Sequence, residues 1–330
     1  MVEYDVINTR ADRLDTPDKA TGRALFVDDI TKPGMLFGAL LQSTLAHARV
    51  LHIDTSEAER LPGVKSVVTA KDTGGVKYGV SPARYDETLF CVDKVRYVGD
   101  EIAAVAAVDM ETAQRALELI KVDYEELPAV FTIEDAMAPG APLLHEAFPG
   151  NICAEVHQEF GDVAAAFKEC DLIKSTTFRN KRQDAAFIEP QGCIADFDLS
   201  GRLTLISSTQ VPHYVQRTVA MVLGIDVGRV RVIKPYVGAG FGIKAATNPM
   251  ELAASLLSMK SGRPVKMNFS REQVFRYGRA RHQFTHQMKT GVKRDGTLLA
   301  LEHTCYLDGG AYSSFGIATV YYAGSLLGGP

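Results

Sequence analysis

The chain has 330 residues, and its 36 basic and 40 acidic side chains give a formal net charge of −4. Apolar residues make up 46% and charged residues 23%, as in ordinary globular proteins, which excludes a collagen-like, low-complexity or disordered polymer. No basic stripe indicates a nucleic-acid partner, and no apolar stretch of about 18 residues indicates a membrane span.

The first 130 residues alternate between strand-like and helix-like segments. Residues 38–43 and 64–69 are typical of strands, and the apolar run 102–108 indicates a strand buried on both faces. Residues 109–120 open with acidic side chains and carry apolar residues at helical spacing, which predicts a helix. Residues 121–125 then alternate as in an edge strand. We therefore expect a mixed α/β fold here.

Residues 138–151 hold three prolines and two glycines, the densest such stretch in the chain. Such composition is typical of a linker. We therefore predict two domains, over residues 1–137 and 152–330, joined by this stretch.

The second part also mixes helices and strands. Asp162 can cap a short helix over residues 161–167. We expect further helices at 212–223 and 249–259, and strands at 194–197, 203–207, 230–233, 265–269, 286–293 and 298–306. A hairpin turn at 294–297 joins the last two strands.

The five cysteines lie far apart and form no Cys-x-x-Cys pair, which disfavours a zinc ribbon or iron–sulfur site within this chain. Their odd number and the polar N-terminal residues favour reduced thiols and a cytoplasmic location. His282 and His286 are four apart in a strand-like segment, about 13 Å, and no acidic or thiol partner stands at ligand spacing. We therefore expect no metal held directly by side chains.

A glycine-rich motif follows the strand expected at 230–233. Its residues are Gly238, Ala239, Gly240, Phe241, Gly242, Ile243 and Lys244. The glycine spacing does not fit a dinucleotide fingerprint, and Ala245 after Lys244 does not fit a Walker loop. Two interpretations stay open: a glycine turn between strand and helix, or backbone N–H groups that approach a bulky anionic ligand.

Two further positions could carry function. Gln210 follows a predicted strand and precedes a helix that starts with proline, so its amide could donate into a cleft or simply cap the helix. Residues 319–330 are apolar and uncharged, which is unusual for a free end. A buried end, an end covered by a partner, or a truncated chain would explain this.

In chain order, the motifs resemble the molybdenum-binding large subunit of the xanthine dehydrogenase family. They are KATG (19–22), HAR (47–49), DKVRYVGDE (93–101), VDYEEL (122–127), GDV (161–163), EP (189–190), STQ (208–210), GAGFGIK (238–244), RE (271–272) and DGGAY (308–312). The resemblance implies an α+β chain, with an α/β hammerhead domain followed by the first half of a molybdopterin-binding domain.

The resemblance also implies roles for single residues. The Gln at the position of Gln210 bonds an oxo ligand of molybdenum in the family, and the Phe-Gly pair matching Phe241 and Gly242 lies against the metal and pterin. Residues 238–242 would thus bind a molybdopterin cofactor, expected in its cytosine dinucleotide form. The pterin holds the metal, which agrees with the expectation of no side-chain ligand. Two [2Fe–2S] clusters and FAD would lie on partner subunits.

Two departures from the family pattern matter. Ile243 replaces a second glycine, and Ala245 stands where purine-oxidising members carry an acid, which argues against xanthine as substrate. Family chains are roughly twice this long, and their essential C-terminal Glu has no counterpart here. We therefore expect either a truncated chain or, as we favour, a second molybdopterin-binding chain that supplies the other half.

Residues 155–167, 209–215 and 309–324 resemble the 4-hydroxybenzoyl-CoA reductase branch most. There Tyr322 matches a tyrosine near the metal, which could protonate an aromatic ring, or it is a packing residue. The predicted function is a subunit of a molybdenum oxidoreductase that hydroxylates or reductively dehydroxylates a small aromatic or N-heteroaromatic substrate. The alternative is a non-catalytic subunit that completes the cofactor cleft.

Overall fold

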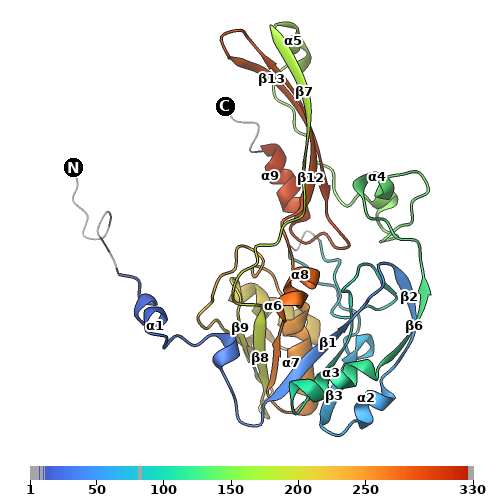
Figure 1. Ribbon diagram of the computed structural model, residues 1–330, viewed down its shortest axis with the longest axis vertical. Helices are drawn as coiled ribbons and strands as arrows, with labels where there is room; N and C mark the ends of the chain where they lie inside the picture. The colour runs from blue at the N-terminus through green and yellow to red at the C-terminus, as the bar shows by residue number, and fades with distance from the viewer. Residues whose placement is uncertain (1–6, 8–9, 11, 81–83, 326–330) are drawn as a thin grey trace.

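The computed structural model describes residue 7, residue 10 and residues 12–80 and 84–325. Helices and strands alternate along most of this length, which confirms the predicted mixed class. The strands form one large sheet in the body of the molecule, a small sheet beside it, and a long sheet that projects from it (Figure 1).

The large sheet has seven strands in the order β10-β9-β8-β11-β1-β5-β3. These strands are β1 (Leu36–Gln42), β3 (Val64–Thr69), β5 (Glu101–Ala107), β8 (Gly192–Phe197), β9 (Leu203–Ser207), β10 (Val230–Ile233) and β11 (Val265–Asn268). β1 pairs in parallel with β11, Leu36 opposite Val265, so strands from both predicted domains share one sheet. The two predicted domains therefore share one sheet and are not packed as separate bodies. The domain boundary expected at residues 138–151 stays a prediction.

β5 is buried along its whole length, as its apolar run predicts. Ala104 and Ala106 belong to the core that includes α7 (Pro249–Ser261). Ala103 and Val105 belong to a second core, with α2 (Ser56–Arg60) and α3 (Met110–Glu118). Because successive side chains of a strand point to opposite faces, a strand between two packed layers is apolar on both faces, as residues 102–107 are; Glu101 at the start of β5 is the exception.

The helix ends follow the capping residues of the sequence. Asp109 accepts a hydrogen bond from the Thr112 N–H at 2.7 Å and so starts α3. Asp162 accepts from the Ala165 N–H at 2.9 Å and starts α5 (Val163–Lys168). α6 (Pro212–Leu223) begins at its proline, as expected, and packs against β10 and α7.

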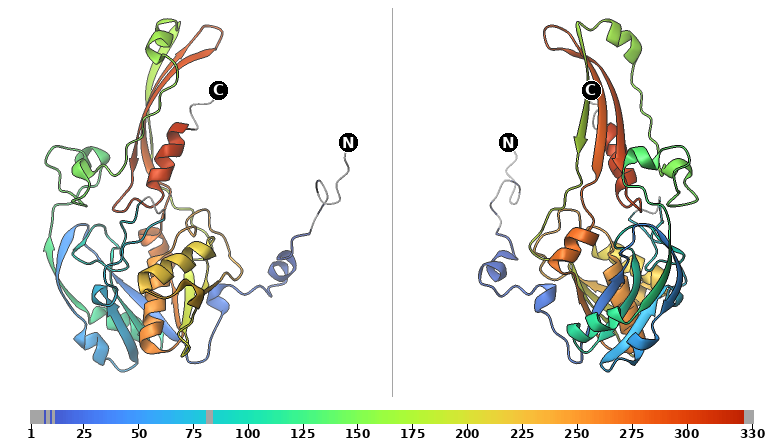
Figure 2. Two further views of the ribbon diagram at one scale, coloured as in Figure 1. Left: turned by 180° about the vertical axis from the view of Figure 1, so that it is seen from behind. Right: turned by 45° about the vertical axis from the view of Figure 1, so that its right-hand side comes forward.

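The two smaller sheets have three strands each. The first has the order β4-β2-β6, with β2 (Ala48–Asp54), β4 (Lys94–Val95) and β6 (Lys121–Glu126), which confirms β6 as an edge strand. The second has the order β13-β12-β7, with β7 (Leu172–Asn180), β12 (Gln283–Val292) and β13 (Leu298–Asp308). This projecting sheet carries α5 at its far end and α9 (Gly316–Ser325) alongside (Figure 2).

The remaining helices are short. They are α1 (Thr16–Ala20), α4 (Ile133–Ala136) and α8 (Arg271–Tyr277), with 3₁₀ turns at Val27–Asp29, Ala70–Asp72, Pro149–Asn151 and Val227–Arg229. Within the described ranges, the helices are all too short or too polar to cross a membrane. All five cysteines are free thiols, as expected.

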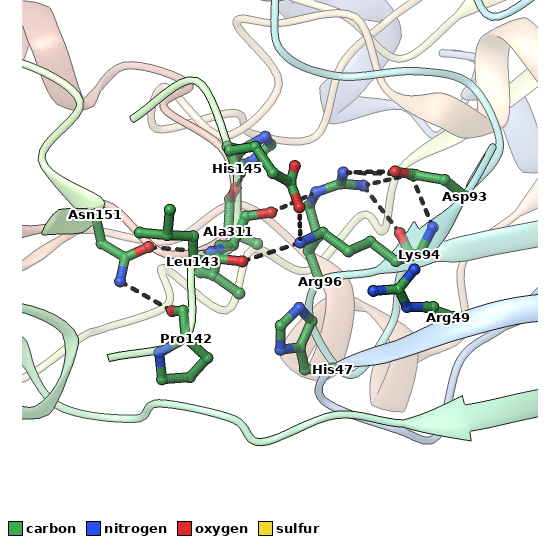
Figure 3. A network of polar contacts seen from close by, with 12 residues as sticks. His47, Arg49, Asp93, Lys94, Arg96, Pro142, Leu143, His145, Asn151 and Ala311 are labelled. Atoms are coloured by element: carbon green, nitrogen blue, oxygen red, sulfur yellow. Dashed lines mark hydrogen bonds and ion pairs between the residues drawn. The ribbon is translucent and has the colours of Figure 1, made fainter. Parts of the chain in front are cut away.

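The stretch predicted as a linker is held by two basic side chains of the DKVRYVGDE motif (Figure 3). Lys94 Nζ donates to the Leu143 carbonyl at 2.9 Å and to Glu146 Oε1 at 2.8 Å. Arg96 Nε donates to the Leu144 carbonyl at 2.9 Å. The stretch therefore lies fixed against the body of the molecule at these points.

Candidate functional site

Gln210 and the glycine motif come together in space. Gln210 stands between β9 and α6, and its backbone N–H donates to the Lys244 carbonyl at 2.8 Å. Its side-chain Oε1 accepts from the Gly242 N–H at 2.9 Å. Two segments that are 32 residues apart are thus hydrogen-bonded to each other.

The glycines of the motif allow this close approach. A Cβ added at Gly240 would overlap the side chain of Gln210, and one at Gly238 would lie 2.7 Å from Glu189 Cβ. At Gly242 a Cβ would meet open space, but its φ of +83° suits glycine best. The motif is therefore a turn fitted closely onto its neighbours, and both interpretations of its glycines remain compatible with the packing.

Phe241 stands out within this loop. Its φ is +48°, a left-handed conformation that costs a residue other than glycine about 1–3 kcal/mol. Its side chain is also 73% exposed, so burial of the ring does not offset this cost. Strained residues of this kind gather where a ligand is bound. Phe241 therefore presents a planar apolar surface beside the amide of Gln210.

An ion pair that the sequence analysis missed lies beneath the loop. Lys244 has a side chain with 0% exposure, and its Nζ donates to Glu189 Oε2 at 2.7 Å, to the Glu189 carbonyl at 2.9 Å and to Ser208 Oγ at 2.7 Å. Ser208 Oγ and the Gly238 N–H also donate to Glu189 Oε2, at 2.8 and 2.7 Å. Glu189 thus links the strand end to the start of the glycine motif.

Burial lowers the pKa of Lys244, and its hydrogen bond to Glu189 opposes this effect. The sequence signals for this network were the EP, STQ and GAGFGIK motifs. These motifs did not predict that Glu189, Ser208 and Lys244, one side chain from each motif, are hydrogen-bonded to one another, because Lys244 and Glu189 are 55 residues apart.

The chemistry available at this surface follows from the hydrogen bonds. The side-chain oxygen of Gln210 accepts a hydrogen bond from Gly242, which leaves Nε2 as a donor without a partner among the described residues. The side chain is exposed and uncharged, so it can bond an oxygen but binds a metal only weakly. A donor beside an exposed aromatic ring suits a ligand that has both polar oxygens and a flat apolar part.

Tyr322 occupies a different part of the fold. It lies on α9, which packs on β13, and its ring is edge-on to Tyr321 with 6.0 Å between the centroids. Val320 and Gly324, two residues to either side, line the cavity described below, so helical geometry turns Tyr322 to the opposite face. Its side chain is 58% exposed, so the interpretation of a buried chain end is wrong at Tyr322.

A large cavity of about 1430 Å³ lies elsewhere in the described part of the chain. Its lining includes buried Glu87, Asp100 and Glu101 and half-buried Arg279 but not Gln210 or the glycine motif. Arg279 pairs with Glu87 at 2.7 Å, and Tyr312 donates to Asp100 Oδ2 at 3.1 Å. Burial raises the pKa of Asp100 to about 6 and the pKa of Glu101 well above its usual range. The cavity therefore carries acidic and basic side chains together and is separate from the site around Gln210.

A hammerhead-like first part, a loop fitted onto a strand-end Gln, and two matching family models define a molybdopterin-binding subunit. Residues 21–128 match the a/b hammerhead domain of aldehyde oxidase and xanthine dehydrogenase, and residues 144–330 match the molybdopterin cofactor-binding domain. The chain belongs to the xanthine dehydrogenase family and corresponds to the N-terminal half of its molybdopterin-binding large subunit.

Individual relatives agree with this assignment. The chain is 37% identical to the nicotinate dehydrogenase large molybdopterin subunit of Eubacterium barkeri, over 96% of this chain and 74% of that protein. It is also 34% identical to the xanthine dehydrogenase molybdenum-binding subunit of Escherichia coli O157:H7, over 92% of this chain but 41% of that protein. The chain thus spans well under half of the second relative.

The fold matches a solved structure in the same way. The quinoline 2-oxidoreductase of Pseudomonas putida 86 superimposes with a TM-score of 0.85 and 32% identity, over 94% of this chain and 40% of that one. This match confirms the predicted arrangement of a hammerhead domain followed by the first part of a molybdopterin-binding domain.

Proposed function

We propose that this chain forms one wall of the cofactor pocket in a molybdenum-dependent oxidoreductase. The observation that carries the proposal is the bond between Gln210 and Gly242, which sets the free amide donor of Gln210 beside exposed Phe241. The residues fit a molybdopterin cofactor, since Gln210 Nε2 would donate to an oxygen of the group and residues 238–242 would lie along it. When bound, the cofactor supplies the redox chemistry.

The residues of this chain would position the reacting groups. Gln210 donates a hydrogen bond and orients its acceptor, and the ring of Phe241 keeps water from that side. Lys244 and Glu189 hold the loop from below through the buried ion pair. In this proposal the cofactor carries cytosine dinucleotide, and [2Fe–2S] and FAD subunits pass the electrons on.

The substrate class proposed is a small aromatic or N-heteroaromatic compound. The names of two similar proteins, nicotinate dehydrogenase and quinoline 2-oxidoreductase, support a nitrogen-containing ring. Ala245 in place of the expected acid argues against a purine.

A second polypeptide is proposed to complete the pocket. The chain spans about two fifths of several relatives, and in this proposal a separate chain supplies the part that corresponds to the rest of their length. The cavity of about 1430 Å³ offers a surface on which such a chain could pack. A cytoplasmic complex is part of this proposal, in agreement with the five free thiols.

Replacement of Gln210 with Ala tests the proposed function. We expect the molybdenum content of the purified complex to stay near the wild-type value, because the remaining contacts hold the cofactor. Loss of a hydrogen bond to a charged or strongly polar group costs about 1.5–3 kcal/mol, which corresponds to roughly 10- to 150-fold in rate.

The matched control is Gln114→Ala, which removes an exposed amide from α3. An unchanged rate in the Gln210 variant would contradict the proposed role. A wild-type complex without molybdenum would instead support the alternative of a non-catalytic subunit that completes the cleft.

The assignment to the 4-hydroxybenzoyl-CoA reductase branch is a finer proposal that rests on sequence stretches alone. Its test is Tyr322→Phe, assayed in the direction of ring reduction and in the direction of hydroxylation. We expect ring reduction to be lost and hydroxylation to change little if the phenol is the proton donor. Small and equal losses in both directions would show that Tyr322 is a packing residue.

A further inference from the structure

Three potential metal ligands gather on one face of the projecting sheet. Cys305 of β13 lies directly opposite His286 of β12, and His303 is two residues from Cys305 on the same strand. His286 Nδ1 and His303 Nε2 are 2.9 Å apart, and one ring nitrogen of each histidine and the Cys305 sulfur all lie within 4.8 Å of one another. All three side chains are half-buried.

The rings are held in place by stacking. His286 stacks on Phe284, with 5.0 Å between centroids and 11° between planes, and on His303, with 5.2 Å and 18°. Phe284 is itself buried, which fixes one end of the stack. The packing therefore holds the two nitrogens close to each other, in a hydrogen bond, before any ligand binds.

We propose that His286 Nδ1, His303 Nε2 and Cys305 Sγ bind one thiophilic divalent cation of the Zn²⁺ class. Two imidazoles and one thiolate are ligands that Zn²⁺ accepts, whereas Mg²⁺ and Ca²⁺ need oxygen ligands, and the cluster contains no carboxylate. Three protein ligands leave the fourth tetrahedral position to water.

Metal binding requires the three side chains to move. Zn–N bonds of about 2.0–2.1 Å and a Zn–S bond of about 2.3 Å place tetrahedral ligand atoms roughly 3.3–3.6 Å apart. His286 Nδ1 and His303 Nε2 now face each other at 2.9 Å, so the two rings would have to turn until both nitrogens point at the metal, and the ring that carries the shared proton would take its other tautomer. Cys305 would lose its thiol proton to solvent, with no change of oxidation state.

This site differs from the sequence expectation that no side chain ligates a metal. That expectation considered His282 and His286 along one strand, where no thiol stands at ligand spacing. The pairing of β12 with β13 supplies the thiol from across the hairpin. The site lies on the projecting sheet and is independent of the proposed molybdenum chemistry at Gln210.

Metal titration tests the inference directly. The purified 330-residue chain is freed of metal with a chelator and titrated with Zn²⁺ in competition with a chromophoric chelator. We expect one equivalent to bind, and Cys305→Ser to weaken binding by more than about 100-fold, since even outer-shell partners cost 10–100-fold when lost. Co²⁺ in place of Zn²⁺ should give a thiolate charge-transfer band that the Ser variant lacks.

The matched control is Cys170→Ser, which removes another half-buried thiol that donates to the Ala166 carbonyl at 3.2 Å. It should leave Zn²⁺ affinity and the Co²⁺ band unchanged. If Cys305→Ser does not fold, His303→Asn is measured instead, with the same expected loss. Absence of stoichiometric binding to the wild type, or equal affinity in the wild type and the folded ligand variant, would overturn the inference.

Discussion

Lys244 is a charged side chain with 0% exposure, and such a group is tolerated only when its charge and all of its N–H donors find partners. Here the three donors reach both a carboxylate and a carbonyl oxygen of Glu189 and the hydroxyl of Ser208. Because Glu189 also accepts from the Gly238 N–H, the ion pair holds the glycine motif as well as itself.

Replacement of Lys244 with Met should destabilise the chain. Removal of one partner leaves the carboxylate of Glu189, which is 14% exposed, without its counter-charge. The free energy of unfolding should fall by about 3 kcal/mol, as for other broken buried pairs. Urea denaturation measures this loss, and molybdenum content of the complex should fall with it because the loop is no longer held.

Lys121→Met is the matched control, since it breaks an ion pair with Glu57 in which both side chains are largely exposed. It should leave stability and molybdenum content close to the wild type. Equal effects of the two lysine variants would show that the buried pair does not hold the loop.

At the scale of elements, the start of α7 depends on a buried carboxyl. The Glu251 carboxylate accepts from the Asn248 N–H at 2.8 Å and from the Ser207 hydroxyl, so it caps the helix and joins it to β9. Burial raises the pKa of Glu251 from 4.5 to about 7, and the bonds from Ser207 and Asn248 oppose this shift. The folded state therefore holds this proton more tightly than the unfolded state.

The raised pKa of Glu251 makes the folded state less stable as the pH rises. The stabilising contribution of the protonated carboxyl is complete below pH 4.5 and is lost as the pH rises to about 7. The loss amounts to roughly 3 kcal/mol at 1.36 kcal/mol per unit. Glu251→Gln should thus gain stability relative to the wild type by about this amount across the same pH range.

Urea denaturation of both proteins at several pH values measures this difference. Because other buried carboxyls titrate in both proteins, only the difference between the two curves reports on Glu251. Glu118→Gln, at an exposed position on α3, is the matched control and should give a curve parallel to the wild type. If stability plotted against pH ran parallel for Glu251→Gln and the wild type, Glu251 would not be the group that causes the loss of stability.

Elements with clear local signals were predicted well. α6 begins at Pro212 and ends before Gly224, which has a φ of +65°, and α3 begins after its Asp109 cap. β7 was missed, because most of its side chains are exposed and so show no apolar alternation. Local sequence patterns indicate which side chains are buried and where an element begins or ends. β7 shows neither signal, because it is held mainly by its pairing with β12.

The site shows the same limit. The glycine motif and Gln210 were found because each stands at the end of a predicted strand. The contacts of Lys244 with Glu189 and of His286 with Cys305 could not be predicted, since only the fold brings these residues together. Pairings across tens of residues have no periodicity along the chain.

At the scale of the whole molecule, the seam between β1 and β11 joins the two predicted domains. Across it, Leu36 and Leu40 share a core with Leu252 and Leu257 of α7. α7 packs on β1, β3 and β5 as well as on β8 and β11. The first part of the chain therefore depends on a helix from the second part to cover one face of its strands.

This dependence predicts how fragments behave. Residues 1–137 expressed alone should expose the face that α7 covers, and so bind a hydrophobic dye and lack near-ultraviolet circular dichroism. Co-expression with residues 152–330 should restore a cooperative unfolding transition, because the seven-stranded sheet can then form from two pieces. Omission of residues 138–151 from both fragments tests the predicted boundary. It also removes the hydrogen bonds of Lys94 and Arg96 to this stretch. A sharp transition for residues 1–137 alone would instead show that this part folds without α7, and that the shared sheet is a late docking of two finished domains.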